Sequence, residues 1–157
     1  MTPATAADRQ RAAQILARLK AAYPDAGCEL HHWRTPFELA VAAILSAQCT
    51  DERVNRITPA LFRAHPTPAD WAALSQEQLE AEIRPTGFFR NKARNIRELA
   101  RVVVERFGGQ LPSDFDTLVQ LPGIGRKTAN LLVATAFGGQ GIIVDTHCGR
   151  VSRRLWF

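Results

Sequence analysis

Apolar residues recur along most of this chain at intervals of three and four positions, which is the spacing of one face of an α-helix. The pattern predicts an N-terminal helix over residues 8–22, which Pro24 ends. It also predicts a helix over residues 37–47, which follows a capping sequence at Thr35 and is apolar on nearly every side. Because a helix that is apolar all round is buried, we expect this second helix at the centre of the fold. An alternating strand pattern appears nowhere in the sequence, so the predicted fold class is all-α.

A third strong pattern predicts one long helix that runs from Phe89 to Phe107 and ends at Gly108-Gly109. Arginines follow the apolar stripe one residue later, so a basic stripe lies about 100° round the same helix. Such a stripe is either a solvated helix face or a surface for phosphate. Within this stretch Lys92 and Arg94 are the residues expected nearest to phosphate.

The segment from residue 116 to residue 137 predicts two helices joined by a tight turn. Gly123 and Gly125 flank Ile124 in this turn, and glycine permits both a positive φ and the close approach of another backbone. The amides of the turn and of the next helical residues, beginning with Arg126, lack partners within the helix and lie at its positive dipole end. This arrangement favours phosphate binding, although an ordinary glycine turn between two helices is the alternative.

Charge and composition narrow the class of protein. The 157 residues carry 20 Lys and Arg against 15 Asp and Glu, a net charge of +5 that is compatible with a polyanionic partner. Ordinary globular composition argues against a disordered chain, and no apolar run is long enough to predict a membrane span. The N-terminus has no apolar signal core, which predicts an intracellular protein. Three scattered cysteines predict neither a disulfide framework nor a zinc site.

Three short strings together resemble one known family. LPGIGRKTAN at residues 121–130 has the form of a helix–hairpin–helix, a clamp for the DNA backbone. With SAQCTD at residues 46–51 and VDTH at residues 144–147, it resembles the endonuclease III family of helix–hairpin–helix DNA glycosylases. The resemblance runs from about Pro36 to Arg154. It implies an all-α, helical DNA-glycosylase core in which the hairpin motif covers about residues 114–137.

Lys127 lies in the first turn of the helix that follows the hairpin. A cation there opposes the helix dipole, and a local rule broken without evident gain is typical of a functional site. The same positive field disfavours the protonated amine, and an amine that attacks carbon must be unprotonated. Contact with phosphate alone is the alternative role. The resemblance implies that Lys127 attacks C1′ of the damaged nucleotide's sugar, forms a Schiff base and nicks the strand by β-elimination.

Asp145 follows an apolar run and precedes a predicted helix, so helix capping alone would explain it. The resemblance implies that Asp145 also activates the lysine and stabilises the developing sugar cation, a role that suits a carboxylate. The sequence departs from the family at Cys148-Gly149, where two bulky apolar residues are usual. Glycine in an early helical turn costs about 1 kcal/mol, so we expect a looser segment behind Asp145.

The resemblance assigns three further side chains to DNA. A base must leave the stack before its bond to the sugar can be cleaved. Gln48 is expected to enter the duplex and bond the orphaned base, Phe88 to act as an apolar wedge, and His147 to contact the backbone. Without the resemblance, Gln48 would be a solvent-facing helix end, Phe88 would pack on Trp71 or Phe62, and His147 would be structural.

The resemblance also divides the chain into three parts. Residues 1–30 would form a helix that packs on a C-terminal cluster domain, residues 31–140 the helical core, and residues 141–157 the start of a second helical lobe. Family members continue further, commonly into a four-cysteine loop that holds an iron–sulfur (4Fe–4S) cluster. Such a cluster, and with it any metal or cofactor, is expected only if a missing C-terminal segment supplies four cysteines. The apolar face of the first helix and the terminal Leu155-Trp156-Phe157 should be exposed, which predicts poor solubility or association.

The function expected from this resemblance is that of a bifunctional DNA glycosylase and AP lyase of base excision repair. Its substrates would be oxidised or ring-damaged pyrimidines in duplex DNA. The alternatives are a non-catalytic helix–hairpin–helix DNA-binding module and a mismatch or purine glycosylase; Lys127 argues against the monofunctional kinds. The expected partner is duplex DNA with damaged bases or abasic sites, with no membrane and no obligate protein partner. The expected location is cytoplasmic, at the nucleoid if the protein is bacterial.

Overall fold

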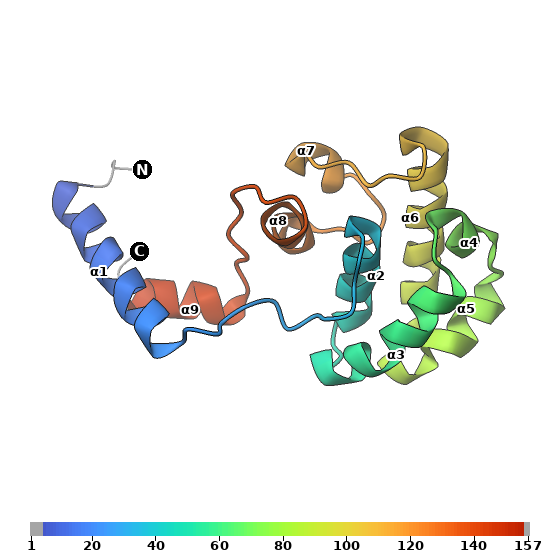
Figure 1. Cartoon of the computed structure of the whole chain (residues 1–157), viewed down its shortest axis with the longest axis horizontal. Coiled ribbons are helices and arrows are strands. Elements are labelled where there is room, and N and C mark those ends of the chain that lie inside the picture. The colour runs from blue at the N-terminus through green and yellow to red at the C-terminus, as the bar shows by residue number, and fades with distance from the viewer. Residues whose placement is uncertain (1–4, 156–157) are drawn as a thin grey trace.

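The structure is a computed structural model that describes residues 5–155. Those residues form helices joined by short connections, with no strand among them, as the all-α prediction requires (Figure 1). In chain order the helices are α1 (Ala6–Ala22), α2 (Pro36–Ser46), α3 (Asp51–Ala64), α4 (Pro68–Ala73), α5 (Gln76–Ile83), the short 3-10 helix η1 (Arg84–Thr86), α6 (Phe89–Phe107), α7 (Phe115–Leu118), α8 (Arg126–Thr135) and α9 (Thr146–Arg154).

Helix α2 lies at the centre of the core, as its apolar sequence predicts. It packs against α3, α6 and α8, and Leu39, Val41 and Leu45 on its surface are completely buried. Burial of each such side chain contributes about 1.5–3 kcal/mol. Because α2 is covered on most sides, its C-terminal end is the part that reaches the surface, and this end carries Gln48.

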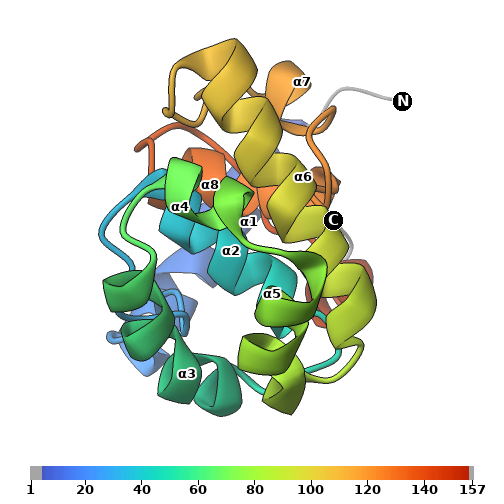
Figure 2. The same ribbon diagram turned by 90° about the vertical axis from the view of Figure 1, so that its right-hand side faces the viewer.

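Helix α6 confirms the predicted long helix and its apolar stripe. Ala93, Ile96 and Val103 are completely buried, and Gly108 ends the helix in the left-handed conformation with φ +59°. Figure 2 shows α6 crossing the face of the core, where it packs beside α4, α5 and α2. Most of the basic stripe faces outward from this helix.

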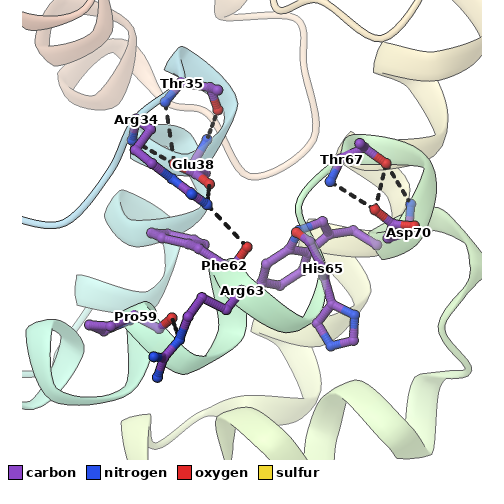
Figure 3. A network of polar contacts seen from close by, with 10 residues as sticks. Arg34, Thr35, Glu38, Pro59, Phe62, Arg63, His65, Thr67 and Asp70 are labelled. Atoms are coloured by element: carbon purple, nitrogen blue, oxygen red, sulfur yellow. Dashed lines mark hydrogen bonds and ion pairs between the residues drawn. The ribbon is translucent and has the colours of Figure 1, made fainter.

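A polar network fixes the start of α2 (Figure 3). Thr35 and Glu38 form a capping box, and the Glu38 side chain is only 2% exposed. Its Oε1 accepts a hydrogen bond from Arg34 Nη2 at 3.0 Å, and Arg34 Nη2 also donates to the Phe62 carbonyl at 3.2 Å. The buried carboxylate is therefore paired and hydrogen-bonded, as a buried charge must be to avoid a large desolvation penalty. The same contacts join α2 to α3.

Helices α1 and α9 lie beside each other, apart from the core (Figure 1). Arg11 on α1 donates a hydrogen bond to the Leu155 carbonyl at 2.7 Å, and no residue of α1 is buried. The prediction that the apolar face of this helix is exposed is confirmed, since Leu16 is 57% exposed. Leu155, for which exposure was also predicted, is half-buried, and the prediction for Trp156 and Phe157 falls outside the described residues.

Candidate active site and nucleic-acid interface

The hairpin between α7 and α8 is held close to the core by glycine. Gly123 has φ +75°, and a Cβ added there would lie 2.9 Å from Ile44 Cδ1 and 3.1 Å from Asn95 Cβ. Ile124, between the two glycines, is buried in the core. Gly125 differs from the expectation, because its φ of −87° is open to any residue. A Cβ added at Gly125 would meet nothing within 4 Å, so this position faces open space.

Helix α8 begins differently from most helices of this chain. In most helices the N-cap side chain accepts a hydrogen bond from an amide of the first turn, as in α1, α2, α3, α4, α5, α7 and α9. The N-cap of α8 is Gly125, which has no side chain to make such a bond. Its first residues, Arg126 and Lys127, are exposed, and the Arg126 guanidinium lies 5.1 Å from the centre of the Phe115 ring. Free amides, a positive dipole end and two cations make this helix start suited to an anion such as phosphate.

The connection from α8 to α9 folds back along α8 and brings Asp145 to Lys127. Gly139 donates its amide to the Val133 carbonyl at 2.9 Å, and a Cβ at Gly141 would lie 2.7 Å from the Asn130 carbonyl oxygen. This close approach directs the connection toward the start of α8. Lys127 and Asp145 consequently line one pocket of about 500 Å³, which we call the Lys127 pocket. Gln48 borders the same pocket.

Asp145 is the N-cap of α9, because its Oδ1 accepts a hydrogen bond from the Cys148 amide at 2.7 Å. That bond holds the pKa of the Asp145 carboxyl below its ordinary value of 3.8, and the charge of Lys127 lowers the pKa further, while partial desolvation acts in the opposite direction. The carboxylate is therefore ionised at neutral pH. Capping is the role that the structure shows, and an ionised carboxylate near Lys127 is compatible with the catalytic role as well.

Gln48 and Phe88 share an unusual backbone conformation. Their φ angles are +51° and +47°, and within residues 5–155 the only other non-glycine residue with a positive φ is His32. Such strain persists where surrounding structure enforces it, and it clusters at functional sites. Phe88 is 66% exposed, so the alternative in which it packs on Trp71 or Phe62 is excluded.

A second pocket, which we call the Phe88 pocket, lies next to the first. It has a volume of about 300 Å³ and is bordered by Gln48, Phe88, Asn91 and Gly123. Ala43, Ala47, Gln48 and Thr128 border both pockets. The end of α2 is therefore the wall between the wedge expected at Phe88 and the amine at Lys127.

The structure corrects the expectation for Lys92. Its side chain is buried, and its ammonium donates hydrogen bonds to the Leu45 and Thr86 carbonyls at 2.7 and 2.8 Å. The prediction was wrong because it did not separate the two faces of the helix. Lys92 faces the core, whereas Arg94, two residues later, is exposed. Arg94 donates to Asn91 Oδ1 at 3.1 Å, and His147 is exposed in the first turn of α9.

Sequence reasoning missed several residues that border the site. Thr128 lies between the two pockets, and Cys28 and Glu29 reach the Lys127 pocket from the connection between α1 and α2. Arg153 of α9 borders a further hollow that Lys127 and Asp145 also line. Thr128 is part of the LPGIGRKTAN string and could have been found from it. The helical periodicity gives no signal for Cys28 and Glu29, because they lie in the connection between α1 and α2.

The described residues contain no group of three or more His, Cys, Asp or Glu side chains arranged to hold a metal ion. Cys28, Cys49 and Cys148 are free thiols. The side chains in this part of the chain therefore do not fit an iron–sulfur cluster. Across residues 5–155, every helix is too short or too polar to cross a membrane.

A hairpin with an open helix start, next to a pocket that contains an amine and a carboxylate, defines a helix–hairpin–helix protein suited to a phosphate backbone. Residues 41–157 match the family described as "HhH-GPD superfamily base excision DNA repair protein", and the chain belongs to this family. The family predicted from the three sequence strings is thereby confirmed.

Named relatives and solved structures agree with this membership. The chain is 53% identical to Endonuclease III of Bacillus subtilis (strain 168) over 85% of this chain and 60% of the relative. It is 51% identical to Endonuclease III of Synechocystis sp. over 96% of this chain and 68% of the relative. A structure of a trapped endonuclease III–DNA covalent intermediate matches with a TM-score of 0.86 and 50% identity, over 92% of this chain and 68% of that chain. The chain thus spans 60–68% of the length of these proteins.

Proposed function

We propose that the chain is a bifunctional DNA glycosylase and AP lyase of base excision repair, with Lys127 as nucleophile. The observation that carries the proposal is the shared pocket of Lys127, Asp145 and Gln48 at the start of the hairpin's second helix. The relative trapped as a covalent DNA intermediate supports a covalent route. The substrate class that we propose is oxidised or ring-damaged pyrimidines in duplex DNA.

In the proposed reaction the unprotonated Lys127 amine attacks C1′, and the bond from C1′ to the base breaks. The base leaves with the bonding electrons and takes up a proton. Loss of the amine proton and opening of the sugar ring give the Schiff base. Removal of a C2′ proton then expels the 3′ phosphate, and water releases Lys127. The ionised Asp145 stabilises the positive charge that develops at the sugar.

DNA binding is proposed for the residues around this pocket. The amides of Gly123, of Gly125 and of the first turn of α8, together with the side chain of Arg126, hold one phosphate at the start of α8. Arg94 on α6 and His147 on α9 contact the backbone on either side. Gln48 and Phe88 enter the duplex and fill the space that the extruded nucleotide leaves.

The division of the chain is likewise a proposal. We assign residues 31–140 to the helical core, residues 1–30 to a helix that packs on a C-terminal cluster domain, and residues 141–157 to the start of a second helical lobe. The contact of Arg11 with the Leu155 carbonyl supports the grouping of α1 with α9. An iron–sulfur cluster, where the longer relatives carry one, would need cysteines other than the three of this chain. The location that we propose is the cytoplasm, at the nucleoid if the protein is bacterial.

The decisive experiment is borohydride trapping on a duplex with one abasic site. Borohydride reduces a Schiff base to a stable amine, so the parent chain is expected to form a covalent protein–DNA adduct. Lys127→Ala should abolish the adduct and retain DNA binding, whereas Lys20→Ala, which removes an exposed lysine of α1, should leave the adduct unchanged. A folded parent that binds the duplex and forms no adduct would instead be a non-catalytic DNA-binding module.

A second arm tests the substrate class. Duplexes that contain thymine glycol, a saturated and oxidised pyrimidine, are compared with matched undamaged duplexes for release of the free base. Release from the damaged duplex alone is expected. Equal release from a mismatched or purine-damaged duplex would assign the chain to another substrate class of the same family.

A further inference from the structure

The least expected polar group in the core is the ammonium of Lys92. The residue is 4% exposed, and Nζ donates to the Leu45 carbonyl at 2.7 Å and to the Thr86 carbonyl at 2.8 Å. Burial lowers the pKa of Lys92 from its ordinary value of 10.5, and the nearby Cys49 opposes this shift. A buried cation is costly unless it is well hydrogen-bonded, so these two bonds are essential to its placement.

The two acceptors belong to different segments of the chain. Leu45 lies in the last turn of α2, three residues before Gln48, and its carbonyl is one of those that a helix end leaves without a helical partner. Thr86 is the last residue of η1, two residues before Phe88. Lys92 itself lies in the first turns of α6, four residues after Phe88.

Both segments then enter a strained conformation. Gln48 and Phe88 have positive φ angles, which non-glycine residues keep only where the surroundings enforce them. Within the described residues neither α2 nor η1 ends in a Schellman-type glycine cap whose amides could donate to the Leu45 or Thr86 carbonyl. The residue after α2 is Ala47, and the amide of Gly87, after η1, donates to the Arg84 carbonyl instead. One ammonium thus hydrogen-bonds the backbone just before each of the two strained residues.

We propose that Lys92 is a positioning residue that fixes Gln48 and Phe88 relative to each other, so that both enter the duplex together. This inference rests on the proposed function, in which those two side chains fill the space of the extruded nucleotide. Lys92 touches neither DNA nor the sugar. Its effect passes through the Leu45 and Thr86 carbonyls to the two turns.

The matched control is Arg97, on the same helix. Arg97 Nε donates to the Leu74 carbonyl, the C-cap of α4, at 2.7 Å. Lys92→Met and Arg97→Met therefore each remove a cation that hydrogen-bonds the carbonyl at a helix end, and each keeps an unbranched apolar side chain. Only the first lies beside the Phe88 pocket. A general loss of stability would appear in both variants, whereas a loss of positioning would appear in Lys92→Met alone.

The first readout needs no DNA. Hydrogen exchange is measured for the amides of residues 46–50 and 86–90, and thermal unfolding is measured in parallel. Lys92→Met should raise exchange in both segments at least about tenfold, the loss expected for charge-assisted hydrogen bonds, and Arg97→Met should not. Unchanged exchange in either segment of Lys92→Met would overturn the proposal, whether or not the parent acts on DNA.

The second readout uses a duplex with an abasic analogue and 2-aminopurine in the opposite strand, whose fluorescence rises when stacking is lost. The parent and Arg97→Met should give the same rise, and Lys92→Met should reduce binding and fluorescence about tenfold. In a Gln48→Ala/Phe88→Ala background, Lys92→Met should change binding less than about twofold, because the side chains that it positions are absent. A full tenfold loss in that background would refute positioning and leave a role in overall stability. A parent without any fluorescence rise would contradict the proposed function, and hydrogen exchange would still decide the role of Lys92.

Discussion

The Lys127 pocket and the Phe88 pocket share a wall at the end of α2, but they are built in different ways. The Lys127 pocket contains the Lys127 amine at the exposed start of α8 and the ionised carboxylate of Asp145, which caps α9. The Phe88 pocket is bordered by an exposed aromatic ring on a strained backbone, with its one cation buried and bonded to carbonyls. The Lys127 pocket offers a ligand reactive and charged side chains, whereas the Phe88 pocket offers it an exposed aromatic surface.

This difference separates two tasks that the proposed reaction requires. Bond breaking at C1′ needs an unprotonated amine that reaches the sugar and a carboxylate whose negative charge lies near it. Opening the duplex needs rigid side chains that replace stacked bases, and it needs no charge at their tips. Substitutions of Lys127 or Asp145 should therefore affect duplex and single-stranded DNA equally. Substitutions in the Phe88 pocket should affect the duplex alone, because a single strand is already unstacked.

The largest effect is expected for Lys127→Ala. Loss of the nucleophile should lower the rate of strand cleavage at an abasic site by about a thousandfold or more, on duplex and single strand alike. Gel assays on both substrates measure this rate, and filter binding measures affinity for the duplex. A variant that cleaves single-stranded DNA at the parental rate would show that another group performs the chemistry.

The next effect separates the two roles of Asp145. Asn caps a helix about as well as Asp, so Asp145→Asn should remove the charge with only a small loss of thermal stability. We expect cleavage to fall about a hundredfold on both substrates, the usual size for loss of one electrostatic group. If the variant unfolds at a lower temperature and keeps its cleavage rate, Asp145 is a cap only.

Phe88→Ala should lower the cleavage rate on the duplex about tenfold and leave the single-strand rate within about twofold. Stacking of one aromatic side chain on a base contributes about 1–3 kcal/mol, and the exposed ring gives up little packing on removal. Rates on the two substrates are compared under single-turnover conditions. Equal losses on both would place Phe88 with the chemistry and remove the distinction between the pockets.

A smaller, stabilising effect is expected at Gly149, in the first turns of α9. A Cβ added there would meet Val144 Cγ1 at 3.9 Å, an ordinary contact. Gly149→Ala should therefore raise the free energy of unfolding by about 0.5–1 kcal/mol through helix propensity, which urea denaturation measures. A loss of stability would show that this segment needs the glycine backbone.

The smallest effect concerns pH. The folded-state pKa of Asp145 lies below its ordinary value of 3.8, so its ionisation stabilises the fold at pH values above 3.8. That contribution is lost as the pH falls through the lowered pKa, and at neutral pH it is fully present. Carboxyl-detected NMR should give a midpoint below 3.8, which rises in Lys127→Ala because one positive charge is removed. A midpoint above 3.8 in the parent would contradict the cap geometry.

Much of this arrangement could be predicted from local sequence. The capping residue Thr35, the apolar stripe of α6 and the LPGIGRKTAN string each depend on neighbours within a few turns, and each lies where it was expected. Both glycines of the turn were expected to permit a positive φ, and Gly123 has one whereas Gly125 does not.

Features that depend on segments far apart in the chain could not be predicted. Lys92 lies in sequence among the arginines of a basic stretch, and only the packing of α2 and η1 around it makes it a buried cation. The connection that brings Glu29 to the Lys127 pocket shows no helical period at all. Strain at Gln48 is likewise a property of the folded backbone, since nothing in its local sequence requires a positive φ.

The most direct test of the central claim is to locate the adduct by mass spectrometry. The parent chain is trapped with borohydride on an abasic duplex, the DNA is digested, and the modified peptide is fragmented. The chain has three lysines, Lys20, Lys92 and Lys127, and the sugar remnant is predicted on Lys127 alone. A remnant on Lys20, on Lys92 or on the terminal amine, with Lys127 unmodified, would contradict the account.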